Sequence, residues 1–406
     1  MTVNRLFGLL ASFLLAAAAT FAVTANVYWD TNHPGRIVMA LLVCILIHGL
    51  RYFRLWLSRE IFLSLAFLGY SLLSLTWTAD MHTATPTLPS LFTFTLVLIL
   101  FSALVAYHDL KAILAGMLAG SLAAAVLYTM ISGYPFSYPE DFSYNTIAGL
   151  YLSGLAITLL FGAYAGLRVL PVALGTVLLT LIATTTSIKT NLGVAIGFIG
   201  AGVLYFNLTI KQAIRDVVVL AIFAGCVAYG VSSNQALIDR VQSGYARVST
   251  GVAVLTNRES DAGNIGLETR EGWKSAGLKG WYTNPVFGYG VEAFRADFGI
   301  TSHSTPIDLL YNSGLIGCSL FYSLSASIAW RLLKARNPNR RGLRGRIAMF
   351  VIAYGFISLS GLQYYDTFLA IFLSLGSGLL VRTERSAAPE SPPLERLIGN
   401  AGANPA

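Results

Sequence analysis

The sequence predicts an all-α polytopic membrane protein, and two observations carry that prediction. Hydrophobic residues make up 55% of the 406-residue chain and charged residues only 11%, with a mean hydropathy of +0.65. A soluble protein usually carries about 25% charged residues. The apolar residues also form repeated runs that are long enough to span a bilayer, because a hydrocarbon core of about 30 Å needs roughly 20 apolar residues in a helix.

About twelve such runs satisfy this length criterion. They cover residues 6–27, 37–50, 61–77, 88–107, 112–132, 146–167, 169–186, 192–207, 216–232, 306–330, 347–364 and 367–381. The first run resembles a secretory signal, with Val23-Thr24-Ala25 where a cleavage site would fall. Its apolar part is long for that role, so we expect it to remain as a transmembrane helix.

The basic residues orient these helices, because Lys and Arg are enriched in short cytoplasmic loops. If the N-terminus is cytoplasmic, most of the 27 basic residues fall on the cytoplasmic face, above all in the loop 331–346. The short loops of the other face then hold only Arg36 and Lys189. The charge distribution therefore predicts that both termini are cytoplasmic.

Four segments follow from this topology. They are residues 1–232 with nine transmembrane helices, 233–305 as one large outer loop, 306–381 with three transmembrane helices, and 382–406 as a cytoplasmic tail. The tail is rich in Pro, Ala and Gly, a composition typical of disorder. A long loop without structure of its own is unusual and often functional.

Parts of the large loop are predicted to be helical. Residues 234–254 show apolar residues near helical spacing. Residues 268–280 begin with acidic residues and end at a glycine, as helices often do. Asn284-Pro285 then indicates a turn.

The membrane helices themselves offer little chemistry. The cysteines Cys44, Cys226 and Cys318 lie far apart in apolar runs, without the spacing of a metal site, and are typical of apolar packing residues. The runs contain almost no ionisable residue, and His48 and Asp308 each lie near an end of their run. Ion-coupled transporters place charged residues near the bilayer midplane, so this pattern argues against a transporter.

The polar residues of interest gather on the outer face. His303 lies shortly before Pro306, which suits the first turn of the next helix. A histidine at this boundary can accept a proton from a hydroxyl near neutral pH. The alternative is an interfacial histidine that hydrogen-bonds a backbone carbonyl.

Two basic residues are candidates for binding an anion. Arg270 lies three residues before Trp273 and therefore on the same face of the predicted helix. Its planar guanidinium matches phosphate, and the alternative is an ordinary surface ion pair with a nearby glutamate. Lys189 lies in the hydroxyl-rich segment 184–191, where it could bind an anion or simply be an exposed lysine.

Glycines and aromatic residues complete the pattern. Gly288 and Gly290 permit a tight turn, and Gly314 and Gly317 permit a close helix contact. Aromatic residues crowd the outer loop 133–145, where a membrane-interface belt explains them and sugar stacking is the alternative.

These residues together resemble the O-antigen ligase and O-antigen polymerase superfamily of bacterial inner-membrane proteins. The resemblance begins at Arg270 and Trp273 and continues through the turn Asn284-Pro-Val-Phe-Gly-Tyr-Gly. It ends with His303 and the pair Gly314-x-x-Gly317. The family also has about twelve transmembrane helices and one large periplasmic loop before that histidine, as the hydropathy predicts here.

The resemblance implies an enzyme that transfers a glycan from undecaprenyl pyrophosphate to an acceptor hydroxyl at the periplasmic face. His303 would be the catalytic base, Arg270 and Lys189 would bind the donor pyrophosphate, and Trp273, Arg295 and Tyr311 would support them. The sequence departs from the family at Ser187-Ile188-Lys189, where Ser-Arg is usual, and at Ser304, where asparagine is usual. The implied reaction is inverting and requires neither a metal nor a cofactor, and nucleic acid is not a partner.

Several functions stay open at this point. The first is an O-antigen ligase, whose acceptor is a sugar of lipid A-core. The second is an O-antigen, capsule or exopolysaccharide polymerase, whose acceptor is another carrier-linked repeat unit. A lipid-linked oligosaccharide flippase or exporter would need a charged path through the membrane, and a structural scaffold would not need His303 or Arg270.

Overall fold

The computed structural model describes residues 3–26, 58–132, 144–166, 169–184, 267–334, 341–358 and 366–387, with four isolated positions between 235 and 242. Within these ranges all regular structure is helical and no strand occurs. The predicted transmembrane segments 37–50, 192–207 and 216–232 lie outside the described residues, as does nearly all of the helix predicted over 234–254. Lys189 also lies outside them.

Long helices occupy each of the other predicted transmembrane segments. They are α1 (Val3–Asn26), α4 (Arg59–Ser74), α6 (Leu88–Tyr107), α7 (Leu110–Ser132), α8 (Tyr144–Ala165), α9 (Val169–Thr184), α15 (Thr305–Lys334), α16 (Arg341–Ser358) and α17 (Thr367–Ala387). Four helical stretches are long and apolar enough to span a membrane: Arg5–Thr24, Met81–Tyr107, Leu110–Ile131 and Thr305–Lys334. The predicted all-helical fold is thereby confirmed for the described residues, in which these four stretches could span a membrane, while the count of twelve stays a prediction.

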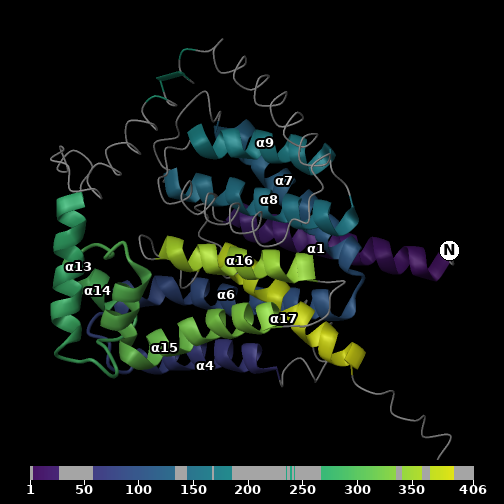
Figure 1. Ribbon diagram of the computed structural model, residues 1–406. Helices are drawn as coiled ribbons and strands as arrows, with labels where there is room; N and C mark the ends of the chain where they lie inside the picture. The colour runs from purple at the N-terminus through teal and green to yellow at the C-terminus, as the bar shows by residue number, and fades with distance from the viewer. Residues whose placement is uncertain are drawn as a thin grey trace, which may run out of the picture.

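The long helices form two packed groups that run in broadly the same direction (Figure 1). One group contains α4, α6, α15, α16 and α17, and the other contains α1, α7, α8 and α9. Contacts of α16 and α17 with α8 join the two groups. The start of α1 and the end of α17 lie at the end of the bundle that faces away from α13 (Leu267–Trp281) (Figure 1).

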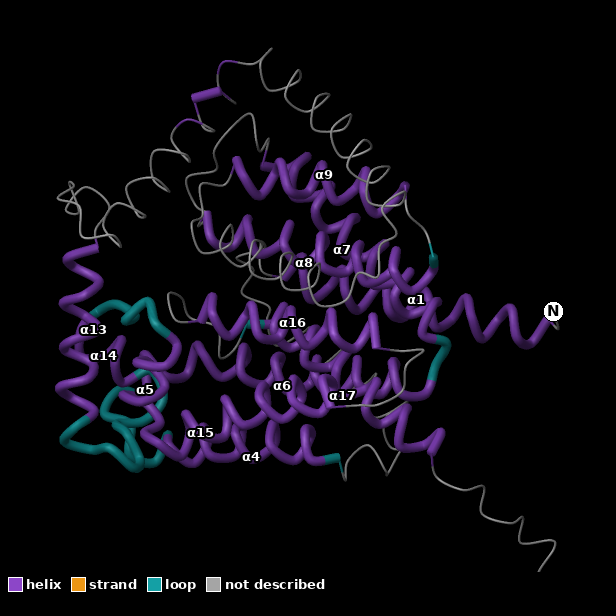
Figure 2. The backbone as a smooth tube through the Cα atoms, in the orientation of Figure 1, coloured by secondary structure: helices purple, strands orange, loops and turns teal. Residues whose placement is uncertain are grey.

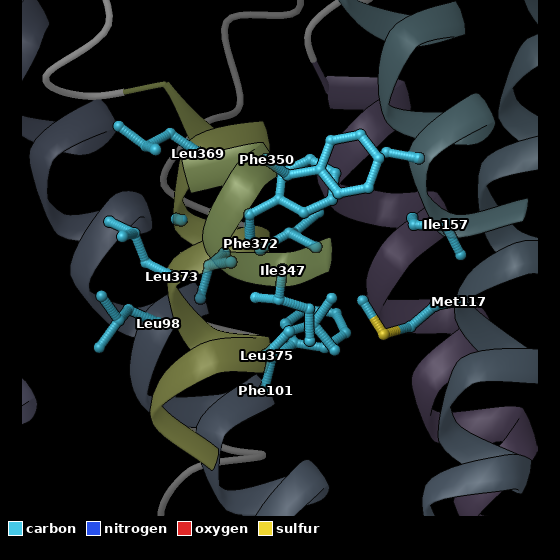
Figure 3. Close-up of a cluster of buried hydrophobic side chains, with 14 of the residues drawn as sticks. Leu98, Phe101, Met117, Ile157, Ile347, Phe350, Leu369, Phe372, Leu373 and Leu375 are labelled. Atoms are coloured by element: carbon cyan, nitrogen blue, oxygen red, sulfur yellow. The ribbon is translucent and has the colours of Figure 1, made fainter. Parts of the chain in front are cut away.

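Aromatic and branched side chains from several helices fill the bundle (Figure 3). Phe101 of α6 and Phe372 of α17 are both fully buried. Phe350 of α16 stacks on Phe372, with the ring centroids 5.6 Å apart. Because α6 is apolar on all sides, it can be surrounded by other helices, and most of its residues are buried.

Glycines bring α7 into backbone contact with α1. A Cβ atom added at Gly116 would lie 2.3 Å from the carbonyl oxygen of Phe13, and one at Gly120 would lie 2.4 Å from that of Ala17. The two glycines are four residues apart on one helix face, facing the alanine-rich middle of α1. This is the small-xxx-small arrangement that lets membrane helices pack closely.

We expect Gly120→Val to destabilise the protein by about 1–3 kcal/mol, because the added side chain must push α1 away from α7. Thermal unfolding in detergent would measure the loss. Gly8→Val in α1 is the matched control, since a Cβ at Gly8 meets nothing within 4 Å. Equal unfolding temperatures for the two variants would contradict the close contact between α1 and α7.

Ion pairs and hydrogen bonds of two arginines link the helices at the end of the bundle opposite α13. Arg331 of α15 bridges Glu60 of α4 and Glu384 of α17. Arg382 donates to the carbonyl oxygens of Val105 (3.2 Å) and His108 (2.7 Å) at the end of α6. The region predicted as a tail thus begins in helix, because α17 continues to Ala387 and its polar side chains bind neighbouring helices.

Candidate functional site

A cap of short helices and loops covers the end of the bundle where α15 begins (Figure 2). It contains α13, α14 (Ala293–Phe298), α5 (Met81–Ala84) and the chain that links α13 to α15. The helix predicted over 268–280 and the turn at Asn284-Pro285 are both confirmed. α13 lies across the ends of the long helices and packs on α15 (Figure 1).

α15 is broken at Gly314, which has φ 59° and ψ −162°. The turn 285–290 supplies the hydrogen bonds that the broken helix lacks. Tyr289 and Gly290 N–H groups donate to the carbonyl oxygens of Tyr311 (2.9 Å) and Asn312 (2.7 Å), and the Leu315 and Ile316 N–H groups donate to Pro285 (2.9 Å) and Val286 (3.3 Å). The loop before His303 and the helix after it therefore fold as one unit.

Glycines make this crossing of two backbones sterically possible. A Cβ at Gly288 would lie 2.5 Å from the nitrogen of Gly314, and one at Gly314 would lie 2.2 Å from the carbonyl oxygen of Val286. The predicted tight turn is confirmed, with φ 69° at Gly288 and 100° at Gly290. Gly317 faces the ring of Tyr70 on α4, whereas Gly314 serves the crossing with the turn and not the expected contact between helices.

His303 lies at the tip of a turn directly before α15. Its φ of 56° is left-handed, which is uncommon outside glycine. The Ser302 N–H donates to Asp308 Oδ1 (3.1 Å), the Ser302 hydroxyl donates to the carbonyl oxygen of Ser304 (3.0 Å), and the Ser304 N–H donates back to that hydroxyl (3.1 Å). Pro306 lies in the first turn of α15, as predicted. The residues on both sides of His303 are therefore fixed.

The His303 ring packs against α13. Its centroid lies 5.6 Å from that of Trp273, with the ring planes inclined by 36°. Both side chains are half-buried, so part of each remains accessible to solvent. Arg270 belongs to the same helix, one turn before Trp273, and the position of its side chain lies outside the described part of the structure.

Two buried carboxyl groups lie near this turn. Asp308 is 1% exposed, and its Oδ2 atom has no hydrogen-bond partner. Glu292 is 2% exposed and lies within electrostatic reach of Asp308. Glu292 (φ 58°) and His303 are the non-glycine residues with positive φ in the described ranges, and such backbone strain clusters at functional sites.

We expect Asp308→Ala to loosen the His303 turn without unfolding the protein. The variant leaves the buried Ser302 N–H without its acceptor, at a local free-energy cost of about 1–3 kcal/mol. The buried Oδ2 atom of Asp308 has no partner and destabilises the folded protein, so its removal recovers part of this free energy. Hydrogen–deuterium exchange of a peptide that covers Ser302 should become about tenfold faster or more. Asp308→Asn keeps an acceptor oxygen and should exchange more slowly than Asp308→Ala, whereas parental exchange in Asp308→Ala would contradict this role.

The other predicted supporting residues have separate positions in the cap. The hydroxyl of Tyr311 donates to Asp297 Oδ2 (2.5 Å), and its ring stacks on Tyr289 with centroids 4.8 Å apart. Tyr311 is buried between α13 and α14 and so supports the cap from within. Arg295 is exposed on α14.

The short helix α5 belongs to the cap, although the apolar runs of the sequence do not indicate it. Asp80 caps this helix by accepting from the N–H groups of His82 (2.9 Å) and Thr83 (3.3 Å). The Thr83 hydroxyl also donates to Asp80, and these hydrogen bonds hold the pKa of the Asp80 carboxyl below its usual value. The aspartate before a short helix is a recognisable N-cap signal. Because α5 belongs to the cap, its exposed His82 lies at the same end of the molecule as His303.

The cap thus combines a fixed histidine, an aromatic ring and an arginine-bearing helix at the end of a membrane helix. Such a site can bind a hydroxyl compound and remove its proton. Within the part of the chain that the structure describes, no group of three His, Cys, Asp or Glu side chains could hold a metal ion. No protein-family model matches the chain, and no curated protein matches it.

Proposed function

We propose that the protein is an integral-membrane glycosyltransferase of the O-antigen ligase type. It transfers a glycan from undecaprenyl pyrophosphate to a sugar hydroxyl of lipid A-core, at the periplasmic face of a bacterial inner membrane. The observation that carries the proposal is the position of His303. It directly precedes the N-terminal end of α15, and its backbone is left-handed. Its ring packs against Trp273 of α13, the helix that also bears Arg270.

The assembly of the cap supports this proposal further. Segments that carry the family resemblance are separated by up to some forty residues along the chain, yet they meet at one place. α13 lies next to the His303 turn, and the turn 285–290 fills the break at Gly314. A bilayer-embedded donor has its pyrophosphate at the membrane surface, which is where a cap on the ends of the membrane helices would meet it.

The proposed reaction is a single displacement. His303 takes the proton of the acceptor hydroxyl as its oxygen attacks the anomeric carbon of the donor sugar. The bond from that carbon to the pyrophosphate oxygen breaks, and undecaprenyl pyrophosphate leaves with the bonding electrons. Arg270 and Lys189 stabilise the negative charge on the leaving group. Because attack and departure occur on opposite faces of the ring, the configuration inverts.

The proposal can be tested with purified protein in liposomes. One reaction contains a carrier-linked glycan with lipid A-core, and a second contains the carrier-linked glycan alone. Glycosylated lipid A-core in the first reaction supports a ligase. Longer carrier-linked chains in the second reaction would identify a polymerase, which shares the same chemistry and differs in its acceptor. Absence of both products, with donor moved across the bilayer, would identify a flippase.

A further inference from the structure

The turn between α13 and α14 has an unusual surface. No charged residue occurs from Trp281 to Val291. The side chains at its tip are apolar and exposed, with Val286 44% and Phe287 53% accessible. A turn at the end of a water-exposed cap would be expected to be polar.

The turn does not lie at the outer edge of the cap but alongside the membrane helices. Its tip is hydrogen-bonded to Leu315 and Ile316, which follow the break at Gly314, and the helical part of α15 before that break is about 13 Å long. Leu315 is 47% exposed, and Leu73 of α4 is 57% exposed. The Phe287 ring also contacts Trp77, just beyond α4 (6.4 Å between centroids). The turn is thus continuous with the apolar outer surface of two predicted transmembrane segments.

The carbonyl groups at the tip of the turn accept hydrogen bonds from other protein groups. The carbonyl oxygen of Pro285 accepts from the Leu315 N–H and from Trp281 Nε1 (3.0 Å). Val286 accepts from the Ile316 N–H, and Phe287 accepts from the Tyr70 hydroxyl (2.9 Å). Gly288 accepts from Asn284 Nδ2 (2.5 Å). Four consecutive carbonyl groups therefore have internal donors, although the side chains between them are exposed.

We infer that the turn 284–290 is a re-entrant element that lies among the acyl chains of the leaflet on the His303 side. Irregular backbone is stable at that depth only where its polar groups are paired within the protein, and the four carbonyl groups from Pro285 to Gly288 meet that condition. Trp77 and Trp281 flank it, as aromatic residues do at the membrane interface. The His303 turn, at the start of α15, then lies nearer the water, at the level of the lipid head groups. Seating in lipid does not depend on which reaction the cap performs.

Spin-label accessibility in liposomes would test this directly. Cys44, Cys226 and Cys318 are first replaced by alanine, and a nitroxide is attached to the full chain in the Phe287→Cys variant. Leu65→Cys on α4 serves as the lipid reference, and Lys279→Cys on α13 serves as the water reference, since both residues are exposed. We expect high collision with oxygen at position 287 and several-fold lower collision with water-soluble Ni-EDDA than at position 279.

Two results would overturn the inference. Ni-EDDA collision equal to that at position 279 would place the turn in water. Low collision with both reagents would mean that another protein surface, such as a second copy of the chain, covers it.

A charge-based comparison provides a second measurement. Phe287→Leu and Phe287→Asp both lose the contact with Trp77, but only aspartate places a charge in lipid. The aspartate variant should unfold at a clearly lower temperature than the leucine variant in liposomes. Equal unfolding temperatures would contradict a lipid-seated turn.

Discussion

Replacing His303 with alanine is expected to lower the rate of glycan transfer by about 10²–10⁴-fold, the range that a positioned general base contributes. The acceptor hydroxyl then loses the group that takes its proton. The half-buried ring fills little of the core, and the neighbouring Ser302 and Ser304 hydrogen bonds do not involve the histidine side chain. Transfer should therefore fall without loss of folding.

His82→Ala is the matched control for that experiment. His82 is an exposed histidine of the same cap, and its side chain has no part in the proposed reaction. Product formation per mole of folded protein should stay at the parental level in the control. If His303→Ala is folded and transfers glycan at the parental rate, His303 is not the base, and the proposed mechanism fails.

The substitution Gly314→Ala is expected to destabilise the protein by about 3–5 kcal/mol, from two causes that add. The conformation at Gly314, with φ 59° and ψ −162°, belongs to a region that is essentially restricted to glycine. The new methyl group would also lie 2.2 Å from the carbonyl oxygen of Val286, a backbone atom that cannot rotate away. The turn and the broken helix would have to separate.

Thermal unfolding in detergent, followed by tryptophan fluorescence, would measure this loss. Gly355→Ala in α16 is the control, because a Cβ there meets nothing within 4 Å. An alanine inside a helix is favoured over glycine by about 1 kcal/mol, so the control should be neutral or slightly more stable. A parental unfolding temperature for Gly314→Ala would mean that the crossing of turn and helix is not rigid.

Local sequence signals were sufficient for the long helices that the structure describes and for α13, although not for the short α5 and α14. Apolar runs located the long helices, including α7 and α15, and the acidic start and glycine end of 268–280 located α13. Pro306 was correctly placed in the first turn of α15. These features depend on neighbouring residues alone, which is why one sequence can predict them.

The break in α15 could not be predicted in the same way. The run 306–330 is apolar and contains no proline after its first turn, so its pattern is that of one continuous helix. The break is stable because Pro285, Val286 and other residues of a distant turn supply the missing hydrogen bonds. Glycine pairs in membrane helices usually indicate a contact between helices, and that rule led to the prediction for Gly314. In the structure Gly314 instead permits the close crossing with the turn 285–290.

The candidate site was predicted in part. His303 and Trp273 were expected from the family resemblance, and the structure brings their rings together. Asp308 was seen only as an ionisable residue near a helix end, because its bond to the Ser302 N–H depends on the unusual turn between them. The proposed roles of Arg270 and Lys189 in binding pyrophosphate stay predictions.

The hydrogen bonds of Tyr70 set an order for the biogenesis of the protein. Its hydroxyl donates to Phe287 and lies 3.1 Å from the carbonyl oxygen of Ser313, partners that are synthesised 217 and 243 residues later. While the ribosome is still translating the loop, α15 does not yet exist. The turn 285–290 then lacks its hydrogen-bond partners on α15, and Tyr70 of α4 lacks its acceptor at Ser313. The crossing of the turn with α15 beside α4 can form only after α15 has been synthesised. Maturation of the cap is therefore a late step, and a chain that stops before α15 would leave the carbonyl groups of Pro285 and Val286 without the N–H donors of Leu315 and Ile316.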